Sequence, residues 1–237
     1  MTPASPEHLS PAFSWDRIQL VVFDVDGTLY RQSTLRWRMA REMLVHAARS
    51  RSFTHIKVLS AYRRLREQLG EAEADGFEPI LVERTAAASG TTPTRVRALV
   101  AEWMEERPLA HVARGRYPGL VELFRGLREQ GREVGILSDY PVDAKLRELG
   151  LFSDHVVWAG QPDVAILKPH PRGLQRLMAA AGAAPSATVL IGDRVSRDGL
   201  AARRAGAHAL IRSDKPQPGW ITFRRFDDPL FAPLLKS

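Results

Sequence analysis

The stretch IQLVVFDVDGTLY at 18–30 constrains the fold more than any other part of the chain. Its first half is an apolar, β-branched run that ends at a glycine turn, which predicts a strand buried on both faces. Asp24 and Asp26 stand one residue apart at its end. Both side chains would point the same way if the strand continued. Either a cation or a proton offsets the repulsion of this buried pair, or the pair is a solvated Asp turn.

Strand-like and helix-like segments alternate after residue 115. Strands are expected at 133–137, 155–158, 188–191 and 208–211, and helices at 119–130, 142–149, 171–181 and 199–205. This alternation predicts an α/β fold, a Rossmann-like parallel sheet covered by helices on both faces. Ligands of such sheets bind at the carboxyl ends of the strands, which is where Asp24 stands.

The segment between the first strand and this core has a different character. Apolar residues recur at helical spacing from about 35 to 104, and Trp37 and Trp103 are expected to pack inside this helical part. The chain is therefore divided into a flexible leader at 1–17, an α/β core at 18–30 plus 108–237, and an inserted all-helical cap at 31–107.

Charge and composition limit the classes of protein that fit. The chain has 237 residues, is 44% hydrophobic and 26% charged, and contains no cysteine, which excludes disulfides and thiolate chemistry. No apolar run approaches the roughly 18 residues of a membrane span, and no secretory signal is recognisable, so a cytoplasmic protein without membrane contact is expected. The net charge of +7 comes largely from arginine, and 31–66 holds ten Lys or Arg against one acid. This basic face is either a lid that attracts anions or an ordinary solvated surface.

Polar residues also follow the other expected strands. Ser138 follows the strand at 133–137, Lys168 stands in LKPHP, and Asp193 and Asp198 stand in GDRVSRD. Together with the first pair of acids they favour phosphoryl transfer. Asp24 and Asp193 could hold Mg²⁺, which prefers oxygen ligands. One carboxylate can attack phosphorus while a second supplies the proton to the leaving group. A lysine can neutralise charge, and a serine can hydrogen-bond a phosphoryl oxygen.

The four segments DVDGTLY, LSDYP, KPHP and GDRVSRD, in this order, resemble the motifs of the haloacid dehalogenase (HAD) superfamily. The helical insert resembles the cap of the phosphoglycolate-phosphatase-like group. The resemblance implies Asp24 as nucleophile and Asp26 as general acid/base. It implies Mg²⁺ held by Asp24, the carbonyl of Asp26 and Asp193, with Asp198 in support. The residues that it assigns to phosphate binding and charge stabilisation are Thr28, Ser138, Asp139 and Lys168.

Two positions depart from the family pattern. Arg194 follows Asp193 where many members have a small hydroxyl residue, and Arg197 precedes Asp198 where a small polar residue is frequent. Each arginine either changes the charge of the pocket or points to solvent.

The expected function is that of a Mg²⁺-dependent phosphatase that hydrolyses a small phosphorylated metabolite through an aspartyl-phosphate. Two alternatives remain open at this point. One is a phosphomutase or phosphotransferase of the same fold. The other is a catalytically idle scaffold that binds nucleic acid or a partner through the basic cap, although nucleic acid is not the expected partner. A homodimer is left open.

Overall fold

The computed structural model describes residues 13–235. Six parallel strands form one sheet in the order β3-β2-β1-β4-β5-β6, which confirms the α/β class. The strands are β1 (Leu20–Phe23), β2 (Glu133–Ser138), β3 (His155–Trp158), β4 (Thr188–Gly192), β5 (His208–Arg212) and β6 (Ile221–Phe223). The order of the sheet reverses at β1, which pairs with β2 on one side and β4 on the other. In sheets of this kind, that point of reversal is where ligands bind.

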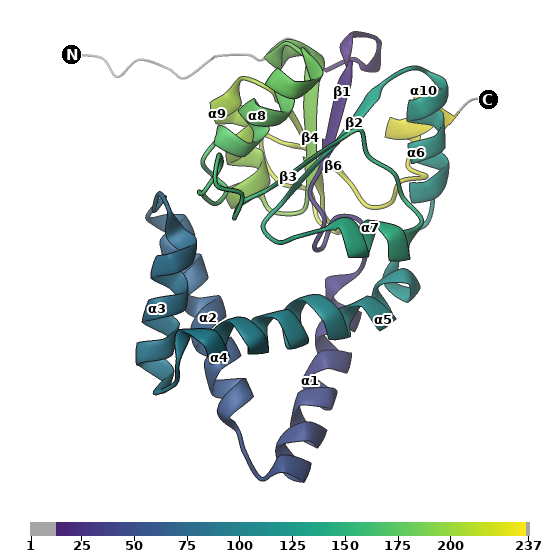
Figure 1. The fold of residues 1–237 in the computed structure, drawn as a ribbon. Coiled ribbons are helices and arrows are strands. Elements are labelled where there is room, and N and C mark those ends of the chain that lie inside the picture. Colours follow the sequence, from purple (N-terminus) through teal and green to yellow (C-terminus); the bar gives the residue numbers. More distant parts are fainter. Residues whose placement is uncertain (1–12, 236–237) are drawn as a thin grey trace.

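Helices cover both faces of the sheet because side chains of β1 alternate between them. Val21 and Phe23 pack with α6 (Leu120–Glu129), α7 (Asp143–Leu149) and α10 (Ala232–Leu235). Leu20 and Val22 pack with α8 (Arg172–Ala181) and α9 (Leu200–Ala205) on the opposite face. Figure 1 shows α8 and α9 on one side of the sheet and α6 and α10 on the other. All four strand residues are fully buried, as expected for a central strand.

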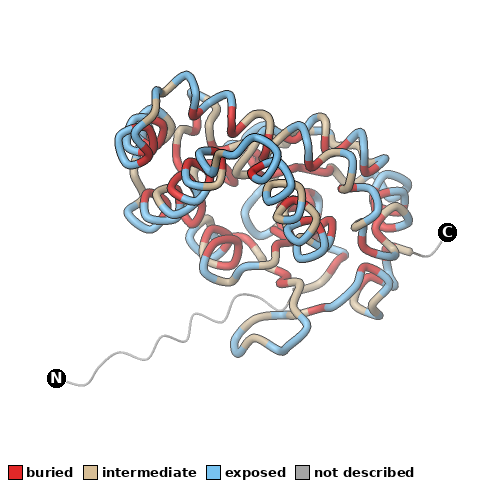
Figure 2. Tube along the Cα trace, turned by 90° about the horizontal axis from the view of Figure 1, so that it is seen from below, coloured by how far each residue is buried: buried red, intermediate tan, exposed pale blue. Residues whose placement is uncertain are grey.

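Helices fill the chain between β1 and β2. They are α1 (Gln32–Ser50), α2 (Thr54–Glu71), α3 (Phe77–Ser89), α4 (Pro93–Val100), the π-helix η2 (Ala101–Glu106) and α5 (Arg107–Gly115). They lie together beyond the end of the sheet at which β1 leads into α1 (Figure 1). Their buried positions alternate with exposed ones along the chain (Figure 2). We refer to 32–115 as the cap, and we retain the division into core and cap as a proposal.

The second cap boundary differs from the expected residue 107. Helical structure continues from α4 through η2 into α5, which ends at Gly115. The backbone N–H of Arg107 donates to the carbonyl of Glu102, five residues earlier, so the chain makes one wide turn there. Pro108 then falls in the first turn of α5, where its missing N–H costs little. Pro108 is therefore accommodated within helical structure that continues from α4 to α5.

The flexible leader expected at 1–17 does not extend through residue 17, because its last residues are folded. Trp15–Arg17 form the short 3₁₀ helix η1, and Trp15 is buried with its indole N–H donating to the carbonyl of Leu230 at 2.7 Å. The indole also lies 5.8 Å from the ring of Phe231, measured between ring centroids. Burial of this large side chain ties the segment to the core. The remainder of the expected leader, 1–12, lies outside the described residues.

Among residues 13–235, no helix combines the length and the apolar character needed to cross a membrane.

Candidate active site

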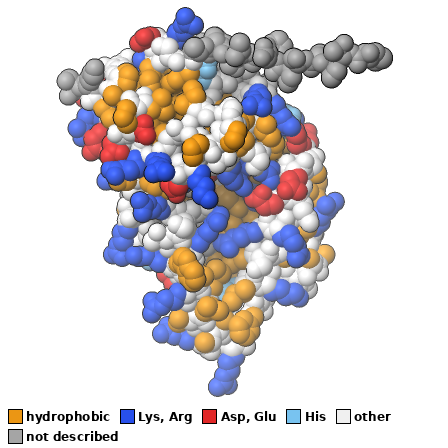
Figure 3. All heavy atoms as spheres, turned by 180° about the vertical axis from the view of Figure 1, so that it is seen from behind, with side chains coloured by type: hydrophobic (Ala, Val, Ile, Leu, Met, Phe, Trp, Pro, Cys, Tyr) orange, Lys and Arg blue, Asp and Glu red, His pale blue; other side chains and the backbone are white. Residues whose placement is uncertain are grey.

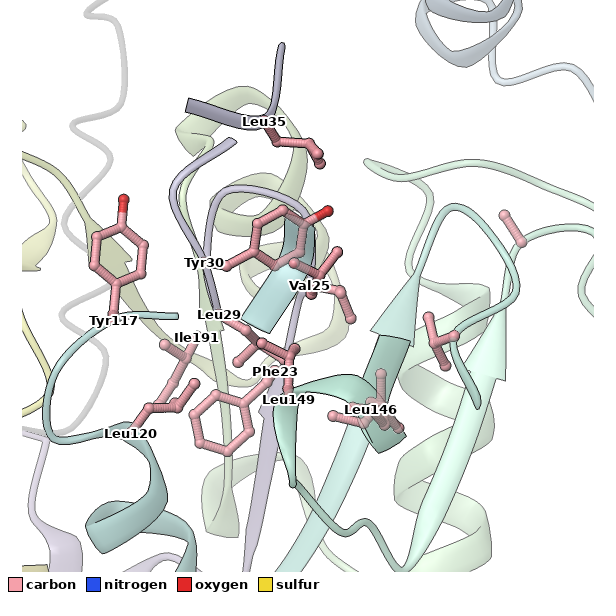
Figure 4. Packing of buried hydrophobic residues seen from close by; sticks show 14 of the residues in the cluster. Phe23, Val25, Leu29, Tyr30, Leu35, Tyr117, Leu120, Leu146, Leu149 and Ile191 are labelled. Carbon is pink, nitrogen blue, oxygen red and sulfur yellow. The ribbon is translucent and has the colours of Figure 1, made fainter. Parts of the chain in front are cut away.

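Asp24 follows the last residue of β1 and is 7% exposed. The buried aromatic and aliphatic side chains beneath it, Phe23 and Ile191 among them, fix the end of this strand (Figure 4). The Oδ2 atom of Asp24 accepts a hydrogen bond from the Thr28 hydroxyl at 2.9 Å, and Oδ1 accepts one from the Lys168 ammonium at 2.5 Å. Both oxygens of the carboxylate are thereby oriented by neighbouring side chains.

Lys168 places one ammonium between two buried carboxylates. Its Nζ lies 2.5 Å from Asp24 Oδ1 and 2.6 Å from Asp198 Oδ1, and Lys168 itself is 5% exposed. A buried ion pair of this kind offsets its desolvation only when its geometry is close, as it is here. Lys168 therefore neutralises part of the negative charge that the strand ends bring together.

Gly27 makes the close approach of Asp193 possible. A Cβ atom at this position would lie 2.2 Å from Asp193 Oδ2, and Gly27 has a φ of 104°, a left-handed conformation that other residues rarely adopt. Asp193 follows β4, the neighbour of β1 in the sheet. The glycine of the DVDGT segment therefore lets the loop after β1 pass against the carboxylate that follows β4.

The three carboxylates Asp24, Asp193 and Asp198 form a group that fits a divalent cation. Each offers an oxygen within 4.8 Å of the others. Asp198 Oδ2 accepts hydrogen bonds from the backbone N–H groups of Asp193 (3.2 Å) and Arg194 (3.0 Å), and its Oδ1 accepts from Lys168. Asp198 therefore supports the loop that carries Asp193 and also contacts Lys168. Carboxylate oxygens are the ligands that Mg²⁺ prefers.

The protonation of this group reflects its burial. Burial raises the pKa of Asp24 to about 8, although the charge of Lys168 acts in the opposite direction. Burial and the charge of Asp198 raise the pKa of Asp193 to about 6. Burial alone would lower the pKa of Lys168, but the charges of Asp198 and Asp24 outweigh it and raise the pKa above its usual range. Burial therefore favours the protonated forms of Asp24 and Asp193, and a cation in place of these protons would stabilise the carboxylates.

Asp26 has partners of its own. Lys145 Nζ donates to Asp26 Oδ1 at 2.7 Å and to Oδ2 at 2.9 Å, and the Tyr30 hydroxyl also donates to Oδ1. Burial acts to raise the pKa of Asp26, but the charge and hydrogen bonds of Lys145 lower it. The two acids of the opening segment are thus separated, each held by a different lysine. Sequence reasoning missed Lys145, which lies on α7 and is 119 residues away from Asp26.

Ser138 and Asp139 stand at the end of β2. Ser138 is buried, and its hydroxyl accepts a hydrogen bond from the backbone N–H of Tyr140 at 3.1 Å. The carbonyl of Asp139 accepts a hydrogen bond from Arg66, and its Oδ2 lies 3.7 Å from Arg194 Nη2. Asp139 thus contacts Arg66 of the cap and Arg194.

A cavity of about 190 Å³ adjoins the Asp139 loop. The cap contributes Arg66, Phe77 and Glu105 to its lining, and the core contributes Asp139, Tyr140 and Trp158. A space of this size admits a small molecule and excludes a macromolecule. Its lining includes Asp139 and Tyr140, the two residues that follow Ser138, but neither Asp24 nor Lys168.

The comparisons with known proteins agree with this geometry. The fold and the carboxylate–lysine group are those of an α/β protein with its candidate site at the carboxyl ends of parallel strands. The family model for haloacid dehalogenase-like hydrolases matches residues 18–206, and the chain belongs to this family. The description of this family makes the chain a hydrolase.

Two curated relatives span most of the chain. A glyceraldehyde 3-phosphate phosphatase from Methanopyrus kandleri is 29% identical over 84% of this chain and 86% of its own length. A phosphoglycolate phosphatase from Cereibacter sphaeroides is 31% identical over 68% of this chain and 70% of its own length. Among solved structures, the HAD-hydrolase YfnB from Bacillus subtilis, bound to magnesium, superimposes with a TM-score of 0.66 at 16% identity, over 92% of this chain and 99% of that one. That similarity shows the fold.

Proposed function

We propose that this protein is a Mg²⁺-dependent phosphatase that hydrolyses a small phosphorylated metabolite through an aspartyl-phosphate on Asp24. The observation that carries the proposal is the placement of Asp24, Asp193 and Lys168 together at the reversal point of the sheet. Curated relatives named as phosphatases of small phosphate esters support it.

Asp24 is the group suited to attack phosphorus. Its Oδ1 is held by Lys168 and its Oδ2 by Thr28, so the carboxylate is oriented before substrate arrives. Asp24 and Asp193 would hold Mg²⁺ together with the carbonyl of Asp26. When bound, the cation would neutralise charge on the carboxylate and on the transferring phosphoryl group.

Lys168 and Ser138 suit the remaining charge on the phosphoryl group. The Lys168 ammonium stands beside Asp24 Oδ1, where negative charge shifts toward the phosphoryl oxygens during transfer. The Ser138 hydroxyl, at the end of the neighbouring strand β2, can donate to one of these oxygens. Thr28 and Asp139 complete the proposed phosphate-binding set, Thr28 by fixing the nucleophile and Asp139 by shaping the loop that carries Ser138.

Asp26 would move the proton in both halves of the reaction. It would protonate the leaving alkoxide, and as a carboxylate it would then take a proton from the water that hydrolyses the phospho-enzyme. The contact with Lys145 favours the carboxylate form, so it favours the second of these steps.

The leaving group of the substrate would occupy the cavity next to Asp139. Aromatic side chains and both signs of charge line this space. Its volume of about 190 Å³ fits a metabolite of a few carbon atoms. The cytoplasm remains the compartment that we expect for such an enzyme.

A panel of phosphate monoesters, assayed with Mg²⁺ and with EDTA, tests the proposal. Wild-type protein should release phosphate from at least one small ester only when Mg²⁺ is present, and Asp24→Asn should abolish turnover. Release of phosphate by Asp24→Asn at the wild-type rate would contradict the assigned nucleophile. Tight binding of nucleic acid without hydrolysis of any ester would favour the scaffold alternative.

A further inference from the structure

Arg197 is buried between the core and the cap. It lies in the π-helix η4 (Val195–Gly199) that follows the Asp193 loop, and it is 7% exposed. Its Nη1 donates to the carbonyl of Lys168 at 2.7 Å. Its Nη2 donates to Glu67 Oε2 at 2.6 Å and to the Glu67 carbonyl at 3.2 Å. One guanidinium therefore contacts both the backbone of the active-site lysine and helix α2 of the cap.

Helix α2 is shaped to receive this guanidinium. A Cβ atom at Gly70 would lie 2.3 Å from Arg197 Nη1 and 3.1 Å from its Cζ. Gly70 stands three residues after Glu67, on the same side of the helix. A larger residue at this position would force the Arg197 guanidinium to shift. The glycine is thus a second feature, independent of the hydrogen bonds, that fits the cap to this arginine.

Arg194 contacts the same carboxylate. Its Nη1 lies 3.1 Å from Glu67 Oε1, so both arginines that depart from the family pattern meet one glutamate of the cap. Burial acts to raise the pKa of Glu67, but the hydrogen bond from Arg197 and the charge of Arg194 lower it. Glu67 is therefore ionised at neutral pH.

In the other cap–core ion pairs the arginine is more exposed than Arg197. Arg204 lies 2.6 Å from Glu73 and Arg172 lies 2.6 Å from Asp75, with arginine side chains that are 42% and 38% exposed. Exposed pairs contribute little to stability because water screens them. The Arg197 side chain is 8% exposed, whereas that of Glu67 is 53% exposed, and Arg197 also donates to the carbonyl of the active-site residue Lys168.

We propose that Arg197 is a positioning residue that fastens helix α2 of the cap to the core and couples this contact to Lys168. When the cap is fastened, the cavity beside Asp139 is closed on its cap side by Arg66 and Phe77, which belong to α2 and α3. When helix α2 moves away and Glu67 leaves Arg197, the Arg197 guanidinium loses the partners that hold it against the Lys168 carbonyl. A closed cap and an ordered lysine are thereby linked through one side chain.

Kinetic measurements on matched variants test the coupling. Glu67→Gln removes the charge that both arginines bind, and Glu71→Gln, on an exposed residue of the same helix, is the control. Arg197→Lys retains the charge, but a lysine cannot reach Glu67 and the Lys168 carbonyl at once. We expect Glu67→Gln and Arg197→Lys each to lower kcat by about tenfold with a smaller change in KM, because the lysine is misplaced.

Two further variants separate positioning from loss of structure. Gly70→Ala should lower kcat in the same way, although alanine is the better helix former, so a weakened helix would not explain the loss. The double variant Glu67→Gln/Arg197→Lys should be no slower than Arg197→Lys alone, because both changes break one contact. Multiplicative losses in the double variant, or a Glu67→Gln enzyme that matches the Glu71→Gln control, would overturn the proposal.

A distance measurement tests whether Arg197 holds the cap against the core, and it does not depend on catalysis. The kinetic measurements, in contrast, rest on the proposed function. The chain has no cysteine, so spin labels can be placed at Lys57→Cys in the cap and Gln175→Cys in the core, both exposed positions. We expect one narrow distance distribution in the otherwise wild-type chain and with Glu71→Gln, and longer, broader distances with Glu67→Gln. Unchanged distances with Glu67→Gln would contradict the fastening. Absence of turnover with every ester would refute the proposed function and leave this result standing.

Discussion

Replacing Lys168 by methionine should destabilise the metal-free protein strongly. The ammonium lies 2.5 Å from Asp24 and 2.6 Å from Asp198, and the side chains of these acids are 10% and 1% exposed. Removing one partner of a buried ion pair costs about 3–5 kcal/mol, because the remaining charge stays buried. For a chain of this length that loss corresponds to a decrease in Tm of about 6–20 °C.

The pH dependence of the variant follows from the acid that loses its cation. The pKa of Asp24 is already raised to about 8 by burial, and without Lys168 it rises further. The folded variant therefore holds a proton that the unfolded chain, with an Asp pKa of about 3.9, releases. The stability that this proton contributes is fully present below the lower of these two pKa values and is lost as the pH rises through the range between them. Mg²⁺ should restore part of the stability, because it binds the folded state.

Urea unfolding followed by circular dichroism, at pH 5.5 and 8 with EDTA or Mg²⁺, measures these effects. Lys57→Met, at an exposed position of α2, is the control and should unfold within about 0.5 kcal/mol of the wild type. A Lys168→Met protein as stable as this control at pH 8 in EDTA would refute the reasoning. It would mean that the two carboxylates do not depend on the lysine.

Three further predictions concern the same site. Gly27→Ala should weaken Mg²⁺ binding in calorimetry, because the new Cβ would meet Asp193, and should cost about 1–2 kcal/mol of stability. The control is Gly131→Ala, which also has a positive φ but open space around it, and this variant should lose stability without losing Mg²⁺ affinity. The affinity of the wild type for Mg²⁺ should increase as the pH rises through 6, where Asp193 loses its proton, and a flat calorimetric profile from pH 5 to 8 would contradict this. Lys145→Met should move the acidic limb of the kcat profile to higher pH, since Lys145 keeps the pKa of Asp26 low, and an unmoved limb would argue against that role.

The sequence predicts the core well because its signals are local. The expected segments at 133–137, 155–158, 188–191 and 208–211 are short apolar runs and agree with β2 to β5 within a residue, whereas β6 was not expected. A polar residue at the end of a parallel strand lies at the same edge as its neighbours, whatever the loops between them do. The grouping of Asp24, Asp193 and Lys168 could therefore be expected before any coordinates.

The cap is less predictable because periodicity does not show which side of a helix is covered. Trp103 is buried as expected, but Trp37 is 80% exposed and Leu44 is 60% exposed, both on α1. The expectation for Trp37 was wrong, since spacing alone cannot distinguish a buried stripe from an exposed one. Hydrophobic side chains are visible at the surface of the cap, among many Lys and Arg side chains (Figure 3).

The sequence alone also could not show which residues contact the site residues. Lys145 contacts Asp26 from a helix 119 residues away, and nothing in the local pattern of α7 marks this lysine. Arg194 and Arg197 were expected to alter the pocket or to face solvent, whereas both contact Glu67 of the cap. Contacts of this kind depend on how two helices are placed, which only the folded structure shows.

The most direct test of the central claim is to locate the phosphoryl group on the enzyme. Protein mixed with Mg²⁺ and its best ester should be quenched in acid within milliseconds, digested and analysed by mass spectrometry. The account predicts one added phosphoryl group on the peptide that contains Asp24, and none in Asp24→Asn. A phosphoryl group on another residue, or turnover of the ester with no phospho-enzyme at any time, would contradict it.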